Sequence, residues 1–281
     1  MQEVVVVLRG GLGNQLFQLA FGLWLTGGDG RRLELNLASY ARASPHGGYA
    51  LRTLFGGAPF AAAETTDFRS LGGRRVTILD LKKAPDAHYE KLATLDGSTV
   101  VVADGWFQNY AYVSPVIEQL RRHYEGGWCS PGTEDEAFFA ANTVIGVHYR
   151  RNDYLRPDVR ELFGIVDPQA MGREVGDLRA RIRSGKPVRV VAFSDGPVQG
   201  DFDRIYQREA SPSLAGDIGA LRLMSLCDHL VCSNSTFGLW AGYLGQRLKT
   251  VSLPSQWTRS GKISARLLLP PNGRLYPADL T

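Results

Sequence analysis

Short apolar runs alternate with segments of helical spacing along this chain, and this alternation restricts the possible folds more than any other feature. In the second half, strand-like runs at Val144–Tyr149, Pro187–Phe193 and Lys249–Leu253 are separated by helical patterns at Pro168–Arg183 and Leu214–Cys227. Strands that alternate with helices are typical of parallel sheets whose faces are covered by helices. The pattern therefore predicts an α/β fold.

The first half follows the same alternation, so the sequence predicts one parallel sheet in each half. The strands predicted there are Val4–Leu8, Arg32–Leu37, Val76–Leu81 and Thr99–Ala103. A chain of 281 residues, 44% of them hydrophobic, is long enough for two domains. We place the boundary near Asn142, which gives domains of residues 1–142 and 143–281, with the last ~20 residues as a candidate to pack back on the first domain.

A glycine-rich turn follows the first predicted strand and opens the first predicted helix. Gly11 and Gly13 fit the start of a dinucleotide-binding fingerprint, but Leu16 stands where its third glycine would be, and the best acidic candidate is Glu34. A nicotinamide-dinucleotide site is therefore disfavoured. What remains is a loop whose backbone can approach a ligand closely. Asn14 is then a ligand contact, the N-cap of the helix, or both.

Polar side chains follow three of the strands predicted in the second half. They are His148, Arg150, Arg151 and Asp153 at the end of Val144–Tyr149, Ser194 and Asp195 at the end of Pro187–Phe193, and Ser233, Asn234, Ser235 and Thr236 after a further short predicted strand, His229–Cys232. Open α/β sheets bind ligands at the carboxyl ends of their strands, so these side chains are predicted to converge on one ligand. Paired guanidiniums suit phosphate, as does the start of a helix. The alternatives are a structural Arg–Asp bridge, plain helix capping by Asn234–Thr236, and a turn role for Asp195.

Composition disfavours several classes of function. The formal net charge is only +4, from 32 basic and 28 acidic residues, which disfavours a nucleic-acid binder. Cys129, Cys227 and Cys232 are too few and too poorly spaced for a disulfide scaffold or a zinc site, and they suit a reducing compartment. We find no targeting peptide and no apolar stretch long enough to span a bilayer, so we expect a cytoplasmic protein. Basic patches assembled in the fold could still bring it to a membrane surface.

Several motifs occur in order along most of the chain. They are GGLGNQLFQ at 10–18, GWFQ at 105–108, HYRRNDY at 148–154, FSD at 193–195, LMSLCDH at 223–229 and NSTF at 234–237. These motifs are similar to the GGLGNQMFQ, GYFQS-type, HxRRxDY, FSDD, LMSxCxH and NSTFSWW segments of the α-1,2-fucosyltransferase family in its bacterial form. Each match alone would be weak, but in this order and at this spacing they are specific. The chain therefore resembles that family.

The resemblance implies a GT-B-like fold, in which two Rossmann-like domains face each other across a cleft. The acceptor side would lie mainly in the first domain and the GDP-fucose site mainly in the second. The implied reaction is an inverting, metal-independent transfer of L-fucose from GDP-β-L-fucose to the 2-hydroxyl of a terminal galactoside. The expected partners are therefore GDP-fucose and a galactose-terminated oligosaccharide, with no metal or other cofactor.

The resemblance also implies roles for individual residues. The donor-binding set would be Asn14, His148, Arg150, Arg151, Asp195, Asn234, Ser235 and Thr236. Within it, Arg150 would neutralise the departing diphosphate, and Asp195 would bind the guanine edge. Asp153 and Asp158 are both candidates for the catalytic base, and a donor phosphate oxygen is a third.

Some residues depart from the family pattern or offer another interpretation. Gly196 stands where a second Asp is common, Asn152 replaces Gly, and Gly238 follows NSTF in place of Ser. Asp201 and Asp203 match the DxD pattern of metal-dependent sugar transferases, but no further oxygen ligands lie nearby in the sequence. Two alternative functions remain: an enzyme that uses another GDP-sugar or forms another linkage, and a non-catalytic glycan- or nucleotide-binding module.

Overall fold

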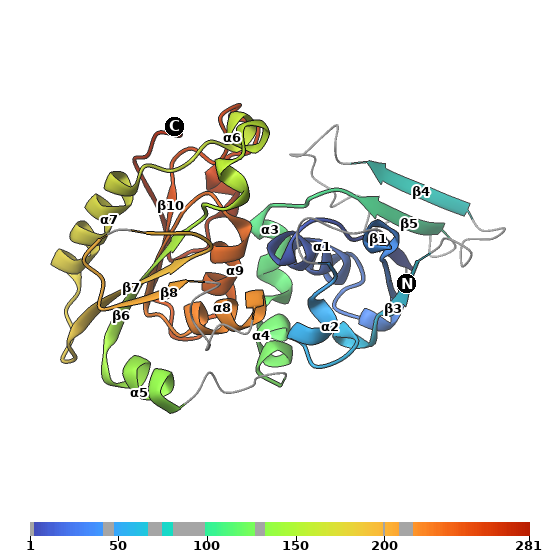
Figure 1. The fold of residues 1–281 in the computed structure, drawn as a ribbon. Coiled ribbons are helices and arrows are strands. Elements are labelled where there is room, and N and C mark those ends of the chain that lie inside the picture. Colours follow the sequence, from blue (N-terminus) through green and yellow to red (C-terminus); the bar gives the residue numbers. More distant parts are fainter. Residues whose placement is uncertain are drawn as a thin grey trace. The chain divides into compact units, whose positions relative to one another are not determined.

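The structure is a computed structural model, and it divides into two compact units, Met1–Trp128 and Cys129–Thr281 (Figure 1). The residues that it describes are 3–41, 48–66, 75–80, 99–126, 133–198, 200–207 and 216–281. Cys129 lies outside these residues, whereas Cys227 and Cys232 are buried and free. Among the described residues, none of the helices has the length and apolar character that crossing a bilayer requires.

The first unit is built around a parallel five-stranded sheet. Its elements are β1 (Val4–Val7), α1 (Leu12–Leu25), β2 (Leu33–Asn36), α2 (Leu51–Leu54), β3 (Ala63–Thr65), β4 (Arg75–Asp80), β5 (Thr99–Asp104), α3 (Tyr110–Val113) and α4 (Ile117–Gly126). The strand order is β3-β2-β1-β5-β4. The valines of β1 are buried and this strand is central, as its continuous apolar run predicts. β3 was not predicted, because it is only three residues long and none of them is buried.

The second unit contains a parallel six-stranded sheet. Its elements are α5 (Thr133–Ala141), β6 (Thr143–Tyr149), α6 (Pro157–Phe163), α7 (Pro168–Arg181), β7 (Val188–Ser194), β8 (Arg204–Gln207), α8 (Gly216–Ser225), β9 (His229–Cys232), α9 (Thr236–Leu244), β10 (Thr250–Pro254) and β11 (Gly273–Tyr276). The strand order is β11-β10-β9-β6-β7-β8. In Figure 1, α7 covers one face of this sheet, and α8 and α9 lie on the other. The predicted α/β fold with one parallel sheet in each half is confirmed.

Alternation along β6 assigns its side chains to the two faces of the sheet. Ile145 and Val147 pack with Met171 of α7 in one apolar cluster. The opposite face holds His148, and it also holds Gly146, where a Cβ atom would come within 2.7 Å of Cys227 Sγ. All seven residues of β6 are buried, so the strand is fixed on both faces before it reaches its polar end.

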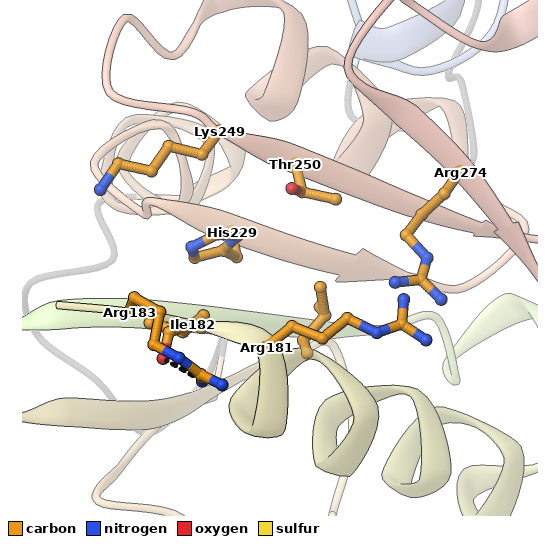
Figure 2. A pocket seen from close by; sticks show the side chains of 8 residues that line it. Arg181, Ile182, Arg183, His229, Lys249, Thr250 and Arg274 are labelled. Carbon is orange, nitrogen blue, oxygen red and sulfur yellow. Dashed lines mark hydrogen bonds between the residues drawn. The ribbon is translucent and has the colours of Figure 1, made fainter.

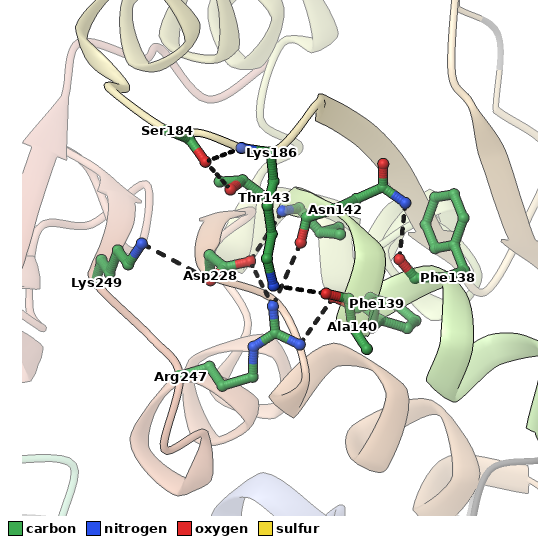
Figure 3. A network of polar contacts seen from close by, with 11 residues as sticks. Phe138, Phe139, Ala140, Asn142, Thr143, Ser184, Lys186, Asp228, Arg247 and Lys249 are labelled. Carbon is green, nitrogen blue, oxygen red and sulfur yellow. Dashed lines mark hydrogen bonds and ion pairs between the residues drawn. The ribbon is translucent and has the colours of Figure 1, made fainter.

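A polar network attaches α5 to the second sheet (Figure 3). Arg247 donates a 2.8 Å hydrogen bond to the Phe139 carbonyl and pairs with Asp228 at 3.0 Å. The same Asp228 carboxylate accepts a hydrogen bond from the Val144 N–H, and Lys186 donates to the Ala140 carbonyl. We placed the domain boundary near Asn142, whereas the structure divides the chain before α5, because these contacts join α5 to the strands that follow it.

The C-terminal residues also lie on the second sheet. β11 pairs with β10 as its edge strand, and backbone hydrogen bonds of 3.1 and 3.0 Å link Thr281 with Ile165. The predicted packing of this segment on the first domain stays a prediction. Its contacts with the second unit arise because the backbone groups of β10 are available along that edge.

Candidate functional site

The carboxyl ends of three neighbouring strands meet in the second unit. β6 lies between β9 and β7, and the polar residues that follow them contact one another. The Arg150 N–H donates to Ser233 Oγ at 3.1 Å, and the Arg151 N–H donates to Asp195 Oδ1 at 2.6 Å. The structure thus brings together the three polar segments that the sequence analysis selected, which we call the strand-end cluster: residues 148–153, 194–195 and 233–236.

Arg150 lies between two carboxylates at the centre of this cluster. Its Nε is 2.8 Å from Asp153 Oδ1, and its Nη1 is 3.0 Å from Asp195 Oδ2. Burial opposes the charge of Arg150, but the Asp195 and Asp153 carboxylates outweigh it, so the pKa of Arg150 is raised. The structural Arg–Asp bridge that we considered as an alternative is therefore present. An anionic ligand would compete with these carboxylates for the guanidinium.

Asp195 organises the turn that carries both arginines. Besides the Arg151 N–H, its Oδ1 accepts a hydrogen bond from the Asn152 N–H at 3.1 Å. Its side chain is only 9% exposed. One carboxylate thus holds two consecutive backbone N–H groups and the Arg150 side chain, which fixes the direction in which Arg150 points. The predicted contact with a guanine edge stays a prediction.

Arg151 points along the other face of the turn. Its guanidinium lies 5.7 Å from the centre of the Tyr149 ring, and its buried Nε has no hydrogen-bond partner among the described residues. A Cβ atom on Gly196 would approach Arg151 Cβ to 3.2 Å. The glycine that replaces the family's second Asp therefore leaves space for Arg151.

In the turn before α9, Asn234 is buried and its amide group holds the backbone of two other segments. Asn234 is 2% exposed, and its amide donates to the carbonyls of Phe163 at 2.9 Å and Trp257 at 3.2 Å. Ser235 is the N-cap residue of α9, but its side chain makes no capping hydrogen bond. Simple capping by the Ser235 hydroxyl, one of our alternatives, is therefore wrong. Thr236 is the first residue of α9, where helix N–H groups are available to an anion.

His148 packs against the backbone of α9, where Gly238 leaves room for its ring. A Cβ atom on Gly238 would lie 2.6 Å from His148 Nδ1 and 2.9 Å from His148 Cγ. The ring is 4% exposed. Burial lowers the pKa of His148 to about 4, with a smaller opposing effect from Asp195 and a further lowering by Arg150. The imidazole is therefore neutral near pH 7.

We expect the protein to lose stability as the pH falls from about 6.5 toward about 4. The unfolded chain binds a proton at His148 near pH 6.5, whereas the folded protein resists protonation until the pH is near its lower pKa. The contribution of the neutral His148 ring to the free energy of unfolding is fully present above pH 6.5. It decreases by up to about 3 kcal/mol as the pH falls toward about 4. NMR titration of the His148 ring in the folded protein tests whether its pKa is lowered. Protonation of the ring near pH 6.5 would contradict this explanation of the pH dependence.

We expect Gly238→Ala to destabilise the second unit by about 2 kcal/mol, because the new methyl group overlaps the buried His148 ring. The matched control is Gly176→Ala in α7, where a Cβ atom would meet nothing within 4 Å. Alanine favours helix, so the control should gain up to about 1 kcal/mol. Urea unfolding of both variants measures the difference, and equal stability changes would refute the steric explanation.

The two candidate bases lie in different surroundings. Asp153 is part of the strand-end cluster, and its side chain is 24% exposed. Asp158, in the first turn of α6, is 64% exposed and pairs with Arg156 at 2.8 Å. A hydrogen bond from Arg156 lowers the pKa of Asp158. The structure therefore brings Asp153, and not Asp158, into direct contact with Arg150.

Asn14 lies in the first unit, within the first turn of α1. Its Oδ1 accepts a 2.9 Å hydrogen bond from Gln108 Nε2. Gly11, and not Asn14, is the N-cap residue of α1, so the capping alternative for Asn14 is wrong. Its predicted role in donor binding stays a prediction.

The segment after β5 adds residues to which the sequence analysis assigned no role. Trp106 is 41% exposed and covers Gly10, where a Cβ atom would lie 3.1 Å from its ring. Gln108 Oε1 is buried and has no hydrogen-bond partner among the described residues. Phe107 has a φ of +50°, and its ring stacks on Phe21 at 3.8 Å. The sequence feature that could have indicated a role for Trp106 and Gln108 is the position of GWFQ directly after a predicted strand.

Asp203, the second carboxylate of the DxD match, serves the fold. Asp203 pairs with Arg189 at 3.0 Å and accepts a hydrogen bond from the Val190 N–H at 2.7 Å, which connects the start of β8 to β7. Within the part of the chain that the structure describes, no group of three His, Cys, Asp or Glu residues is placed to hold a metal ion.

Comparison with known proteins shows what the second unit is similar to. The model of glycosyl transferase family 11 matches residues 134–264. The galactoside α-(1,2)-fucosyltransferase 1 of Homo sapiens is 33% identical over 108 residues, which are 36% of this chain and 29% of that protein. The galactoside 2-α-L-fucosyltransferase Sec1 of Mus musculus is 31% identical over 115 residues, which are 37% of this chain and 29% of that protein. The matches thus span less than a third of these relatives.

A solved structure is similar to this chain in fold. The chain aligns with the selenomethionine form of the fucosyltransferase NodZ from Bradyrhizobium at a TM-score of 0.50 and 15% identity, over 85% of this chain and 91% of that one. At this identity the likeness concerns the fold alone, and it agrees with the predicted GT-B-like class of two α/β units. The matched residues contain the strand-end cluster, so residues 134–264 of this chain are similar to glycosyl transferase family 11, and the predicted resemblance to α-1,2-fucosyltransferases is confirmed.

Proposed function

We propose that this chain is an inverting glycosyltransferase that moves L-fucose from GDP-β-L-fucose to the 2-hydroxyl of a terminal galactoside without a metal ion. The family match over residues 134–264 and the names of the relatives support the class of reaction. The observation that carries the proposal is Arg150, held at the end of β6 by Asp153 and Asp195. A fixed guanidinium can neutralise a departing diphosphate, as a divalent cation does in other enzymes.

The donor would bind at the strand-end cluster. Arg150 would contact the β-phosphate, and the N–H groups at the start of α9, with Ser235 and Thr236, would contact phosphate oxygens. The Nε of Arg151 has no hydrogen-bond partner among the residues that the structure describes, so a further acceptor could satisfy it. Asp195 would keep Arg150 oriented while the charge of the leaving group develops.

Diphosphate binding would also release a carboxylate. Asp153 and Asp195 both pair with Arg150, and the Asp153 side chain is the more exposed of the two. A diphosphate would therefore take the place of Asp153 as the second partner of the guanidinium. The freed Asp153 carboxylate would then accept the proton of the attacking hydroxyl, on the face of fucose opposite to GDP.

The acceptor sugar would bind in the first unit, beside the glycine-rich turn. Trp106 offers an exposed ring against which the apolar face of a sugar can pack, and Gln108 offers a buried oxygen that lacks a partner among the described residues. Sugar sites commonly combine an aromatic surface with a few fixed polar groups. Asn14 holds the Gln108 amide group in place.

We expect Trp106→Ala to raise the acceptor KM about tenfold, because it removes this apolar surface. The KM for GDP-fucose should stay the same, and Trp106→Phe should retain most of the acceptor affinity. Ile78→Ala is the matched control, since Ile78 is an exposed apolar residue of β4 in the same unit. Initial rates at varied acceptor concentration measure the effect, and an unchanged acceptor KM in Trp106→Ala would contradict this assignment.

The decisive experiment is incubation with GDP-fucose and lactose, N-acetyllactosamine or a type 1 disaccharide in the presence of EDTA, followed by linkage analysis. Fucose linked α-1,2 to galactose is the expected product. A different linkage would favour an enzyme with another specificity, and a requirement for metal would contradict the role of Arg150. Calorimetry with GDP, GMP and UDP completes the test, because a glycan-binding module without catalytic function would bind sugar but not GDP.

A further inference from the structure

A second pocket lies at the amino ends of β9 and β10, at the opposite end of these strands from the strand-end cluster. His229 and Thr250 are the first residues of these strands and are register partners, so they lie on the same face of the sheet. α7 covers this face only as far as Arg181. The opening beyond the end of α7 has a volume of about 290 Å³, and Figure 2 shows the side chains that line it.

Among the described residues, four cationic side chains and no carboxylate line this pocket. They are Arg181 and Arg183 at the end of α7, Lys249 before β10, and Arg274 of β11. In Figure 2, the guanidinium groups of Arg181 and Arg274 extend toward the same side of the pocket. Side chains that surround one opening with positive charge favour an anionic ligand.

The carboxylates around the pocket only partly balance these charges. Glu174 pairs with Arg274 at 3.1 Å and also accepts a hydrogen bond from Ser252. Asp228 pairs with Arg247 at 3.0 Å and lies 4.0 Å from Lys249. Asp177 is 4.0 Å from Arg181, with both side chains more than 60% exposed, so it contributes little. Arg183 donates to the carbonyls of Ala180 and Ile182, and to no carboxylate of a described residue.

His229 provides an independent observation at the same place. It ends the LMSLCDH motif, which the proposed donor site leaves unused. The residue is 7% exposed, and its buried Nδ1 has no hydrogen-bond partner among the described residues. A buried polar atom without a partner is costly, and such atoms commonly mark a site that a ligand completes. Burial lowers the pKa of His229, so its neutral ring can donate one N–H to an anion.

We infer that this pocket binds the phosphoryl group of a second ligand, separately from the donor site. The oxygens of a phosphoryl group suit the guanidiniums of Arg181 and Arg274, the ammonium of Lys249 and the ring N–H of His229. β9 is four residues long, which places the pocket on the order of 10 Å from the strand-end cluster. The alternative is that Arg181 and Arg183 only compensate the negative end of the α7 dipole.

Titration calorimetry with inorganic pyrophosphate tests the site in the Arg150→Ala background, in which the proposed donor site is impaired. Arg181→Gln and Lys249→Gln should each weaken the remaining binding about tenfold, the effect expected for one charged hydrogen bond. Within the described part of the chain neither residue has an ion pair shorter than 4.0 Å, so the fold should tolerate both changes. Arg179→Gln, an exposed position of α7 outside the pocket, is the control with the same charge change.

Two further measurements complete the test. In the Arg150→Ala protein, pyrophosphate should shift the NMR signals of the His229 ring. Cosedimentation with phosphatidylcholine vesicles, with or without phosphatidic acid, distinguishes a lipid head group from a soluble phosphate ester. Binding to either phosphate source that depends on Arg181 and Lys249 supports the site. An unshifted His229 ring, or equal weakening by Arg179→Gln, overturns it.

Discussion

Arg150→Ala is expected to lower kcat by about 10²–10³-fold or more, while the protein still folds. The reason is that no other described side chain of the strand-end cluster is fixed by two carboxylates as Arg150 is, at 2.8 Å from Asp153 and 3.0 Å from Asp195. Without it, the negative charge on the departing diphosphate would be left largely uncompensated. Asp195 keeps its hydrogen bonds from the N–H groups of Arg151 and Asn152, so the turn itself should persist.

Single-turnover rates with GDP-fucose and lactose measure the loss. Arg156→Ala is the matched control, because Arg156 is an exposed arginine that also pairs with a carboxylate. Circular dichroism and thermal unfolding should show a folded protein in both cases. Appreciable turnover by folded Arg150→Ala would refute the central role of the guanidinium. Arg150→Lys should restore only part of the rate, since a lysine cannot reach Asp153 and Asp195 with the same planar geometry.

Asp153→Asn is the second large effect that we expect, with kcat lowered about 10²–10⁴-fold through loss of the base. Asparagine keeps the size of the side chain and can still accept a hydrogen bond from Arg150, but it cannot take up the proton of the acceptor hydroxyl. The assignment depends on the position of Asp153 within the cluster, where a diphosphate can displace it from Arg150.

Asp158→Asn provides the matched comparison, because Asp158 is the other candidate and pairs with the exposed Arg156 instead. We expect its rate to stay close to that of the parent protein. The pH dependence of kcat in each variant identifies the group that must be deprotonated. A normal rate in Asp153→Asn with a large loss in Asp158→Asn would reverse the assignment, and normal rates in both would favour a donor phosphate oxygen as the base.

Much of the architecture could be predicted from local patterns. The buried valines of β1 and the apolar run of β6 identify central strands, because a strand covered on both faces must be apolar throughout. The short edge strands β3 and β8 escaped prediction, since they carry no such run. β11 was also missed, and its pairing with β10 depends on residues far apart along the chain.

The sequence by itself determined the α/β class, the strand ends where polar residues gather, and the motif order that indicates the family. These are local properties, since periodicity and spacing act over a few residues. Only the tertiary structure decided that Arg150 lies between Asp153 and Asp195, that Asp158 pairs with Arg156 instead, and that Gly238 leaves space for the His148 ring. The contacts of Arg150 with Asp195 and of Gly238 with His148 join separate segments, and they form only when parallel strands align their ends, so no pattern within one segment can specify them. The pairs Arg150–Asp153 and Arg156–Asp158 are local, but periodicity and spacing do not tell which of these side chains meet.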